Sequence, residues 1–570
     1  MSKSHVMDFL GLYGAIIEDC AVYHPILRRG LDRDLSRLKA LYSNRGDNLF
    51  LIDLPRVGKL LDKALAHGVL TTNGEPLTRG ISSRTKIPRL FSGLWLTLFE
   101  LDGCLKQDID PNFVLFLRTL YQVFKKYELE CAPEYLFEAT KEFYDVESVL
   151  PVPDPLWDSD GRSCYDVDPG SLVDRSRSDS MDKGLFANWQ SASDSSLLSL
   201  VQLVADRVSS SLGEYLPQDF RFRHGPGATA EFPSGKSYKY SFPSWSPRLD
   251  WIFPQEVFAF ANPSILGGWN GSGDVPRHEY HSRLIAVPKT ATGPRLIAAE
   301  PTCHQWCQQS VRAFLDDRIR HTHMSSSIDF RRQDLSGDAA LSASLTGEFA
   351  TVDLKSASDR LSCWLIQRLF RANRSVLAAL ISTRTRYIRN GIDKKMPSLH
   401  KLRKFASMGS ALTFPIQSIV FYMLCVAAGA SLQKRTDLSM PALRRLGSQV
   451  RVYGDDLIIP VSWVPRVRYI LERLYLRVNV DKTFDTGFFR ESCGVDAYKG
   501  CDVTPPRVRV RYTESIAGTL QSVVDVSNHF FTKGFWHASD WLKNTVPTNV
   551  RKYVPVVHVS SGSFGLASFV

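Results

Sequence analysis

The chain has 570 residues, of which 44% are hydrophobic and 23% are charged. This length allows several domains or one large multi-lobed enzyme, and the composition excludes collagen-like, coiled-coil and wholly disordered proteins. Lys and Arg outnumber Asp and Glu by 70 to 59, and the formal charge of +11 favours a polyanionic partner. The 10 cysteines are scattered rather than clustered, which favours a reducing compartment.

The first part of the chain is expected to be helical. Residues 1–150 contain segments with apolar side chains at three- and four-residue spacing, such as 35–41 and 113–120. Residues 151–200 are rich in Ser and Asp and are expected to form a linker or surface loop. The longest apolar run, 419–430, is too short to span a bilayer, so we expect a buried helix there and no membrane contact.

From about residue 200 the sequence indicates a mixed α/β structure. The expected elements are a hairpin of strands 284–288 and 295–298, a buried strand 349–354, a helix from about Asp359, a long helix 409–430, and strands 450–453 and 456–460. Gly454 and Asp455 supply the turn between the last two strands.

Acidic residues occupy two of these strand ends. Asp455 and Asp456 are neighbours at the last turn, and Asp353 lies near the end of the strand 349–354. Neighbouring carboxylates repel each other unless a cation lies between them, and a buried unpaired carboxylate is costly. One interpretation is an acidic hairpin turn and a salt-bridged or helix-capping acid. The other places the three acids on adjacent strands, where they would hold two Mg²⁺ ions, with Mn²⁺ as a substitute, for phosphoryl transfer.

The order of these residues resembles the palm motifs of RNA-dependent RNA polymerases. The motifs are Asp353 with Asp359, then Ser407-Met408-Gly409 with Thr413, then Tyr453-Gly454-Asp455-Asp456, then Lys482. The finer resemblance, over about 280–510, is to the replicase subunit of the positive-strand RNA bacteriophages, the leviviruses. It rests on residues 350–359 and 489–505, and on the basic stretch from Val287-Pro288-Lys289 through Arg295 to Glu300-Pro301.

This resemblance implies an α/β (α+β) right-hand polymerase fold with fingers, a palm containing an antiparallel sheet, and a short thumb. The expected regions are a helical N-terminal region at 1–150, the linker or loop at 151–200, fingers with part of the palm at 201–345, the catalytic palm at 346–500 and the thumb at 501–570. The first 200 residues match no pattern that we recognise.

The resemblance also implies roles for single residues. Asp353, Asp455 and Asp456 would bind the metal ions, and Lys482 would protonate the leaving pyrophosphate. The plain alternative for Lys482 is an ordinary surface lysine.

Nucleotide binding is implied for a second set of residues. Lys289 and Arg295 would neutralise the triphosphate, although a solvated charged hairpin has the same composition. Asp359 would accept a hydrogen bond from a ribose hydroxyl, and its alternative role is to favour the start of a helix. The remaining members of the set are Ser407, Gly409 and Thr413.

The implied function is RNA-directed RNA synthesis that replicates a single-stranded RNA phage genome. A reverse transcriptase shares the palm fold, but Ser358 is too small to exclude a 2′-hydroxyl as the bulky aromatic of those enzymes does. A basic RNA-binding protein without chemistry would not need three acids. The implied partners are RNA template and product, ribonucleoside triphosphates, and host elongation factors Tu and Ts with a host ribosomal protein, in the cytoplasm of the infected bacterial host.

Overall fold

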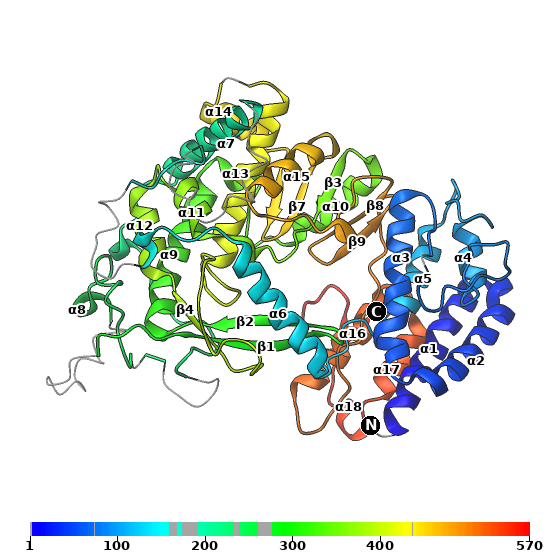
Figure 1. Cartoon of the computed structure of the whole chain (residues 1–570). Coiled ribbons are helices and arrows are strands. Elements are labelled where there is room, and N and C mark those ends of the chain that lie inside the picture. The colour runs from blue at the N-terminus through cyan, green and yellow to red at the C-terminus, as the bar shows by residue number, and fades with distance from the viewer. Residues whose placement is uncertain are drawn as a thin grey trace.

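Helices and strands are mixed along the chain, which confirms the coarse α/β assignment (Figure 1). The computed structural model describes residues 3–72, 74–158, 168–173, 192–232, 239–240, 242–259, 276–435 and 437–570. The linker or loop expected at 151–200 lies in part outside the described residues. Within it, Pro155–Asp158 form a 3-10 helix and α7 begins at Ala192.

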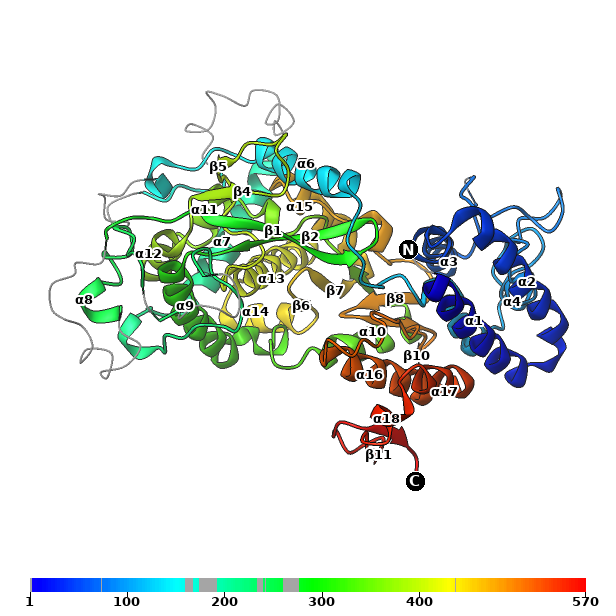
Figure 2. The same ribbon diagram turned by 90° about the horizontal axis from the view of Figure 1, so that it is seen from below.

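The N-terminal region forms a helical body together with the end of the chain. Its apolar side chains share one hydrophobic core with Phe530, Phe535 and Leu542 of the C-terminal helices, so the blue and red segments lie side by side in Figures 1 and 2. The helices of this body are α1 (Lys3–Tyr23), α2 (Arg28–Arg45), a π-helix (Leu49–Asp53), α3 (Leu54–His67), α4 (Ser92–Leu98), α5 (Pro111–Gln122), α16 (Gly518–Thr532) and α17 (Trp536–Asn544). The chain ends with α18 (Thr548–Arg551) and the parallel strands β11 (Val556–His558) and β12 (Leu566–Ser568).

A long apolar helix, α13 (Thr413–Leu432), lies in the largest hydrophobic core. It is the one helix among the described residues that is long and apolar enough to cross a membrane, and 89% of its apolar window is buried inside the protein. The prediction of a buried helix is therefore confirmed. Helices that contribute to the same core are α7 (Ala192–Ser211), α9 (Thr302–His321), α11 (Cys363–Leu369), α12 (Arg374–Thr383), α14 (Met440–Gly447) and α15 (Val464–Arg473), with the short α8 (Gln255–Phe258) beside them.

Three antiparallel strands form what we call the acid sheet, in the order β3–β7–β6. They are β3 (Phe349–Val352), β6 (Arg451–Tyr453) and β7 (Asp456–Pro460), as the sequence predicted. Next to this sheet lie α10 (Asp334–Thr346) and a smaller antiparallel sheet of β8 (Phe489–Ser492), β9 (Val495–Tyr498) and β10 (Cys501–Asp502).

A second sheet, the hairpin sheet, contains the predicted basic hairpin. Its strands, in spatial order, are β2 (Gly293–Ala299), β1 (Ser282–Thr290), β4 (Tyr387–Asn390) and β5 (Leu399–Lys401). Helix α6 (Pro133–Val149) packs on this sheet through Phe143, which joins Leu284 and Ala298 in a separate apolar cluster. Figure 1 shows α6 crossing in front of β1 and β2, away from the other N-terminal helices.

Two predicted helix starts are wrong. The helix expected from about Asp359 is a 3-10 helix, Ser358–Arg360, and α11 begins only after Ser362, whose extended backbone and side-chain hydrogen bond to the Leu365 amide (3.2 Å) cap it. The helix expected from residue 409 begins at Thr413. The preceding loop is bound to β2 instead, because the Ala298 amide donates to the Met408 carbonyl at 2.7 Å.

Candidate active site

Three acidic side chains lie at one edge of the acid sheet. Asp353 directly follows β3, Asp455 lies in the turn between β6 and β7, and Asp456 is the first residue of β7. Val352 and Leu457 are partners in the antiparallel register, so the end of β3 and the start of β7 share an edge. The structure has the acids on adjacent strands as expected, and their metal-binding role stays a prediction.

Glycine is required in the turn that carries Asp455. Gly454 has a φ of +66°, and a Cβ there would lie 2.5 Å from the Phe414 ring. Its amide donates to the Ser418 hydroxyl at 3.0 Å, which ties the turn to α13. Any other residue would be strained by the backbone angle and by the contact with the ring.

Burial raises the pKa values of two of the three acids, and the cations nearby do not offset this rise. Burial raises the pKa of Asp353 to about 6, with Asp455 adding to the rise and Lys482 opposing it. Burial, followed by the charges of Asp455 and Asp353, raises the pKa of Asp456 to about 7. Such a group of carboxylates gains from a bound cation, and Mg²⁺ prefers oxygen donors of this kind.

Lys482 and Asn479 contact the first acid. The Asn479 side-chain amide donates to Asp353 Oδ2 at 2.7 Å, and Lys482 Nζ lies 3.7 Å from the same oxygen and 3.9 Å from Glu491 Oε1. Burial alone would lower the pKa of Lys482, but Glu491 and Asp353 outweigh it and raise the pKa. Lys482 therefore carries a proton beside the acids, and Asn479 is a neighbour that the sequence analysis missed.

Asp456 points differently from its two partners. Its Oδ2 accepts a hydrogen bond from the Cys493 amide at 3.0 Å, in the turn between β8 and β9, whereas Asp353 and Asp455 line a cavity. Within the described part of the chain, no three His, Cys, Asp or Glu side chains form a ready metal cluster. The donor chemistry of the acids fits Mg²⁺, with Asp353 and Asp455 as the pair that faces the cavity.

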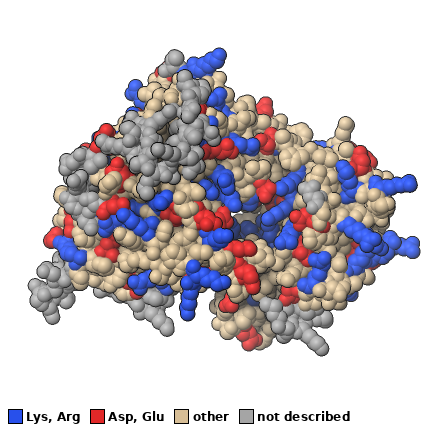
Figure 3. Space-filling view, in the orientation of Figure 1, with Lys and Arg blue, Asp and Glu red and all other residues tan. Residues whose placement is uncertain are grey.

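The cavity has a volume of about 600 Å³ and brings most of the predicted residues together. Figure 3 shows this face of the molecule hollowed near its centre, with Lys and Arg side chains around the hollow. Predicted residues that line the cavity are Asp353, Asp455, Lys482, Lys289, Arg295, Asp359, Gly409 and Thr413.

The basic hairpin provides cations in the same cavity. Lys289 lies near the tip of the β1–β2 hairpin, and Arg295 pairs with Val287 across it. Burial lowers the pKa of Lys289, and the charges of Arg295 and Lys482 lower it further. Three cationic side chains thus repel one another beside the acids, an arrangement suited to a polyphosphate.

The Ser407–Gly409 loop is fixed by close backbone packing. Gly409 has a φ of +118°, and a Cβ there would lie 2.0 Å from the Ala298 carbonyl oxygen. The Thr413 hydroxyl donates to the Ser407 carbonyl at 2.7 Å. Ser407 itself is buried and lines a small neighbouring cavity, whereas Met408, Gly409, Ser410 and Thr413 line the large one.

Asp359 lies in the cavity wall next to a lysine that the sequence analysis did not select. Lys404 Nζ is 2.8 Å from Asp359 Oδ1, and the Lys404 side chain is fully buried. Helix α6 supplies further wall residues: Ala139, Glu142, Phe143 and Val146. No local motif marks these residues, because their position depends on α6 packing across the hairpin sheet.

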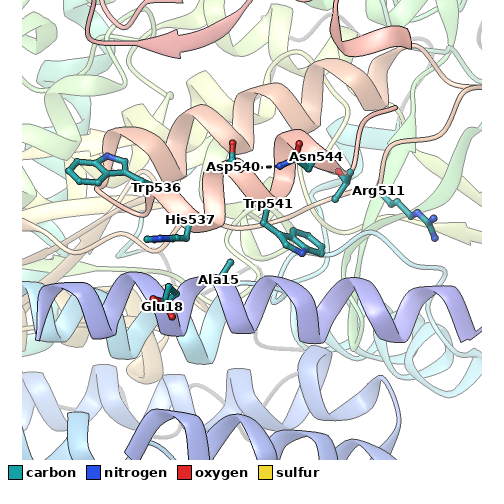
Figure 4. Close-up of a pocket in the computed structure, with 9 residues that line it drawn as sticks. Ala15, Glu18, Arg511, Trp536, His537, Asp540, Trp541 and Asn544 are labelled. Atoms are coloured by element: carbon teal, nitrogen blue, oxygen red, sulfur yellow. Dashed lines mark hydrogen bonds between the residues drawn. The ribbon is translucent and has the colours of Figure 1, made fainter. Parts of the chain in front are cut away.

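A second hollow lies between α1 and α17 (Figure 4). It has a volume of about 820 Å³, and its wall includes Trp536, Trp541 and Arg511. Beside it, the buried Asp19 accepts hydrogen bonds from the amides of His537 (2.9 Å) and Ala538 (3.0 Å) and so joins the two helices. None of the predicted site residues lines this hollow, although it is the larger of the two.

Comparison with known proteins points to one family. Residues 190–531 match the family model described as RNA replicase, beta-chain. The chain is 34% identical over 229 residues to the RNA-directed RNA polymerase beta chain of Enterobacteria phage GA, covering 40% of this chain and 39% of the relative. It is 35% identical over 231 residues to the RNA-directed RNA polymerase subunit beta of Escherichia virus Qbeta, covering 40% and 36%. The corresponding beta chain of Escherichia phage MS2 is 32% identical over 222 residues, covering 39% and 36%. The chain thus spans less than two fifths of the length of these curated relatives.

Proposed function

Because the chain belongs to the RNA replicase beta-chain family, we propose that it is an RNA-directed RNA polymerase that copies a single-stranded RNA genome. The observation that carries this proposal is the cavity in which Asp353 and Asp455 face Lys289, Arg295 and Lys482. Paired carboxylates opposite clustered cations suit a reaction at a polyphosphate, and pure RNA binding would not require the acids.

The proposed architecture is a right hand. The acid sheet with α13 would form the palm at 346–500, and the hairpin sheet would belong to the fingers at 201–345, with palm residues among them. The segment 501–570 would form a short thumb. The antiparallel order β3–β7–β6, with the acids at one edge, supports this assignment.

We propose two Mg²⁺ ions, or Mn²⁺ in their place, at Asp353, Asp455 and Asp456. When bound, they would supply Lewis-acid activation of the attacking 3′-hydroxyl and neutralise charge on the leaving group. The raised pKa values of Asp353 and Asp456 support a cation at this edge, because a positive charge there would favour the ionised carboxylates.

The other side chains would bind the nucleotide and move its protons. Lys289 and Arg295 would hold the triphosphate, and Lys482, with its raised pKa, would give a proton to the pyrophosphate as it leaves. Asp359 would accept a hydrogen bond from the ribose 2′-hydroxyl. Gly409 would allow close approach of the nucleotide to the backbone, with Ser407 and Thr413 keeping the loop in place.

The proposed partners follow from the same function. They are an RNA template and product, the four ribonucleoside triphosphates, and, as candidates, host elongation factors Tu and Ts and a ribosomal protein. The proposed place of action is the cytoplasm of an infected bacterium.

Nucleotide incorporation by the purified chain on a short RNA template tests the proposal. We expect template-dependent RNA synthesis in Mg²⁺, with host extract added in a parallel reaction to reveal dependence on host proteins. A chain that incorporates deoxyribonucleotides as well as ribonucleotides would favour a reverse transcriptase. A chain that binds RNA but incorporates nothing in either reaction would favour a binding protein.

RNA affinity provides a second test. If the cations around the active-site cavity contact several phosphates, the affinity for RNA should fall by about 10³-fold between about 50 and 200 mM salt. Filter binding or fluorescence anisotropy with one labelled RNA measures this dependence. A flat salt response would contradict the proposed RNA path.

A further inference from the structure

Lys404 is a lysine in the interior of the protein. Its side chain is 0% exposed, and its Nζ lies 3.4 Å from the centroid of the Phe143 ring. Burying an ammonium group is costly unless its charge is compensated, so a lysine in this position needs partners. It pairs with two carboxylates, which lie on two elements far apart in the sequence.

The first partner is Glu147, near the end of α6. Its Oε1 lies 3.4 Å from Lys404 Nζ, and its side chain is 1% exposed. Its Oε2 accepts a hydrogen bond from the Arg403 amide at 2.6 Å. Burial would raise the pKa of Glu147, but Lys404 and then His400 outweigh it and lower the pKa, so Glu147 is ionised.

The second partner is Asp359, in the wall of the active-site cavity. Its Oδ1 lies 2.8 Å from Lys404 Nζ, and 23% of its side chain is exposed. Asp359 is therefore the one carboxylate of the pair that a nucleotide in the cavity can reach, while Glu147 is sealed behind it.

The backbone around Lys404 is also fixed. Residues 403–405 run against residues 361–363, with hydrogen bonds from the Cys363 amide to the Arg403 carbonyl (3.1 Å) and from the Phe405 amide to the Leu361 carbonyl (2.7 Å). The segment that carries Asp359 and the segment that carries Lys404 are thus joined directly. The backbone of Lys404 is therefore held by residues 361–363, and its side chain is held by Glu147 and Asp359.

We propose that Lys404, anchored by Glu147, is a positioning residue that holds the Asp359 carboxylate in the orientation that recognises the ribose 2′-hydroxyl. This inference rests on the proposed function. It makes sugar selection depend on α6, because α6 supplies Glu147 and Phe143. A site built to bond a hydroxyl rejects the analogue that lacks it only while its own acceptor is held in place.

The test compares a ribonucleotide with its 2′-deoxy analogue on one RNA template, as a ratio of kcat/KM values. We expect the wild type to favour the ribonucleotide strongly, Asp359→Ala to lose most of that preference, and Lys404→Met to lose about tenfold or more of it. The double variant Asp359→Ala/Lys404→Met should discriminate no less than Asp359→Ala alone, since Lys404 acts through Asp359. Lys401→Met is the matched control, because Lys401 is half exposed and pairs with Asp158 instead.

Two further variants keep the test decisive if Lys404→Met does not fold. Glu147→Gln retains the acceptor for the Arg403 amide and should lower the ratio by a smaller factor. Glu147→Gln/Lys404→Met removes both buried charges together and should lower the ratio as Lys404→Met would. Thermal unfolding establishes that each variant is folded.

The outcomes separate this inference from the proposed function. A wild-type chain that makes no RNA overturns both. A wild-type chain that makes RNA, with folded Lys404 variants that keep the wild-type ratio and lose only rate or stability, overturns the positioning role alone. A double variant that discriminates much less than Asp359→Ala would likewise show that Lys404 does not act through Asp359.

Discussion

The centre of the chain and its two ends are held together in different ways. In the centre, residues 282–504, the acids lie at the ends of strands and the basic residues on a hairpin, and the turns of both are recognisable in the sequence. The N-terminal and C-terminal segments instead share one core, joined by contacts such as Asp19 to the start of α17, and Arg118 joins the N-terminal segment to Asp496 of the centre at 2.9 Å. Local sequence motifs therefore identify the site residues, whereas contacts between distant segments hold together the body around the site.

If the centre carries the chemistry, a change at the acid edge should affect turnover and leave stability intact. Asp353→Asn should lower RNA synthesis by about 100-fold or more, because the loss of a metal ligand costs several kcal/mol in the transition state. Nucleotide incorporation and thermal unfolding measure the two quantities. Asp481→Asn is the control, since Asp481 is exposed and pairs with Lys63 at the surface. Equal losses in both variants would contradict the assignment.

If the body around the centre carries stability, a change at the buried ion pairs that attach the N-terminal segment to the centre should have the opposite effect. Arg118 is 1% exposed and lies 2.7 Å from Asp62 and 2.9 Å from Asp496. Arg118→Met therefore takes this cation away from Asp62, and it leaves Asp496 with its second partner, Arg507, at 3.1 Å. We expect a loss of about 3–5 kcal/mol in the free energy of unfolding. Urea unfolding measures it, and Arg28→Met, which breaks an exposed pair with Glu18, should change little. A destabilisation as small as that of Arg28→Met would mean that Arg118 does not hold the N-terminal segment against β9.

The glycine of the acidic turn gives a smaller and more local effect. Gly454→Ala should cost about 1–2 kcal/mol from the left-handed backbone alone, with the contact to Phe414 adding to it. If the turn shifts to relieve this strain, it displaces Asp455, and we expect turnover to fall by about tenfold, which is about 1.4 kcal/mol in activation free energy. Gly518→Ala is the control, because a Cβ there meets nothing within 4 Å. Full activity in Gly454→Ala would show that the turn tolerates movement.

The sequence was informative where neighbours in the chain are neighbours in space. The turn at Gly454 and Asp455, the β1–β2 hairpin and the strand before Asp353 could all be predicted, because alternation and turn residues specify them. Helix starts at Asp359 and Gly409 were wrong, since Ser362 caps α11 and β2 holds the Met408 carbonyl.

Other features depended on contacts that no local pattern records. Asn479 beside Asp353 and α6 in the cavity wall come from segments more than 100 residues away from Asp353. The direction of the Asp456 side chain is a further case, because it follows from a hydrogen bond to the Cys493 amide, in the turn between β8 and β9. The mostly helical N-terminal region was predicted, but the hydrophobic core that it shares with α16 and α17 was not.

The central claim is that Asp455, facing the cavity beside Asp353, takes part in nucleotide transfer. Single-nucleotide incorporation on an RNA template in Mg²⁺, comparing the wild type with Asp455→Asn, tests it most directly. The change keeps the shape of the side chain and removes its charge, so we expect unchanged RNA affinity and turnover lowered by about 100-fold or more. If Asp455→Asn keeps more than about a tenth of wild-type turnover, a difference under 1.4 kcal/mol, the claim is contradicted.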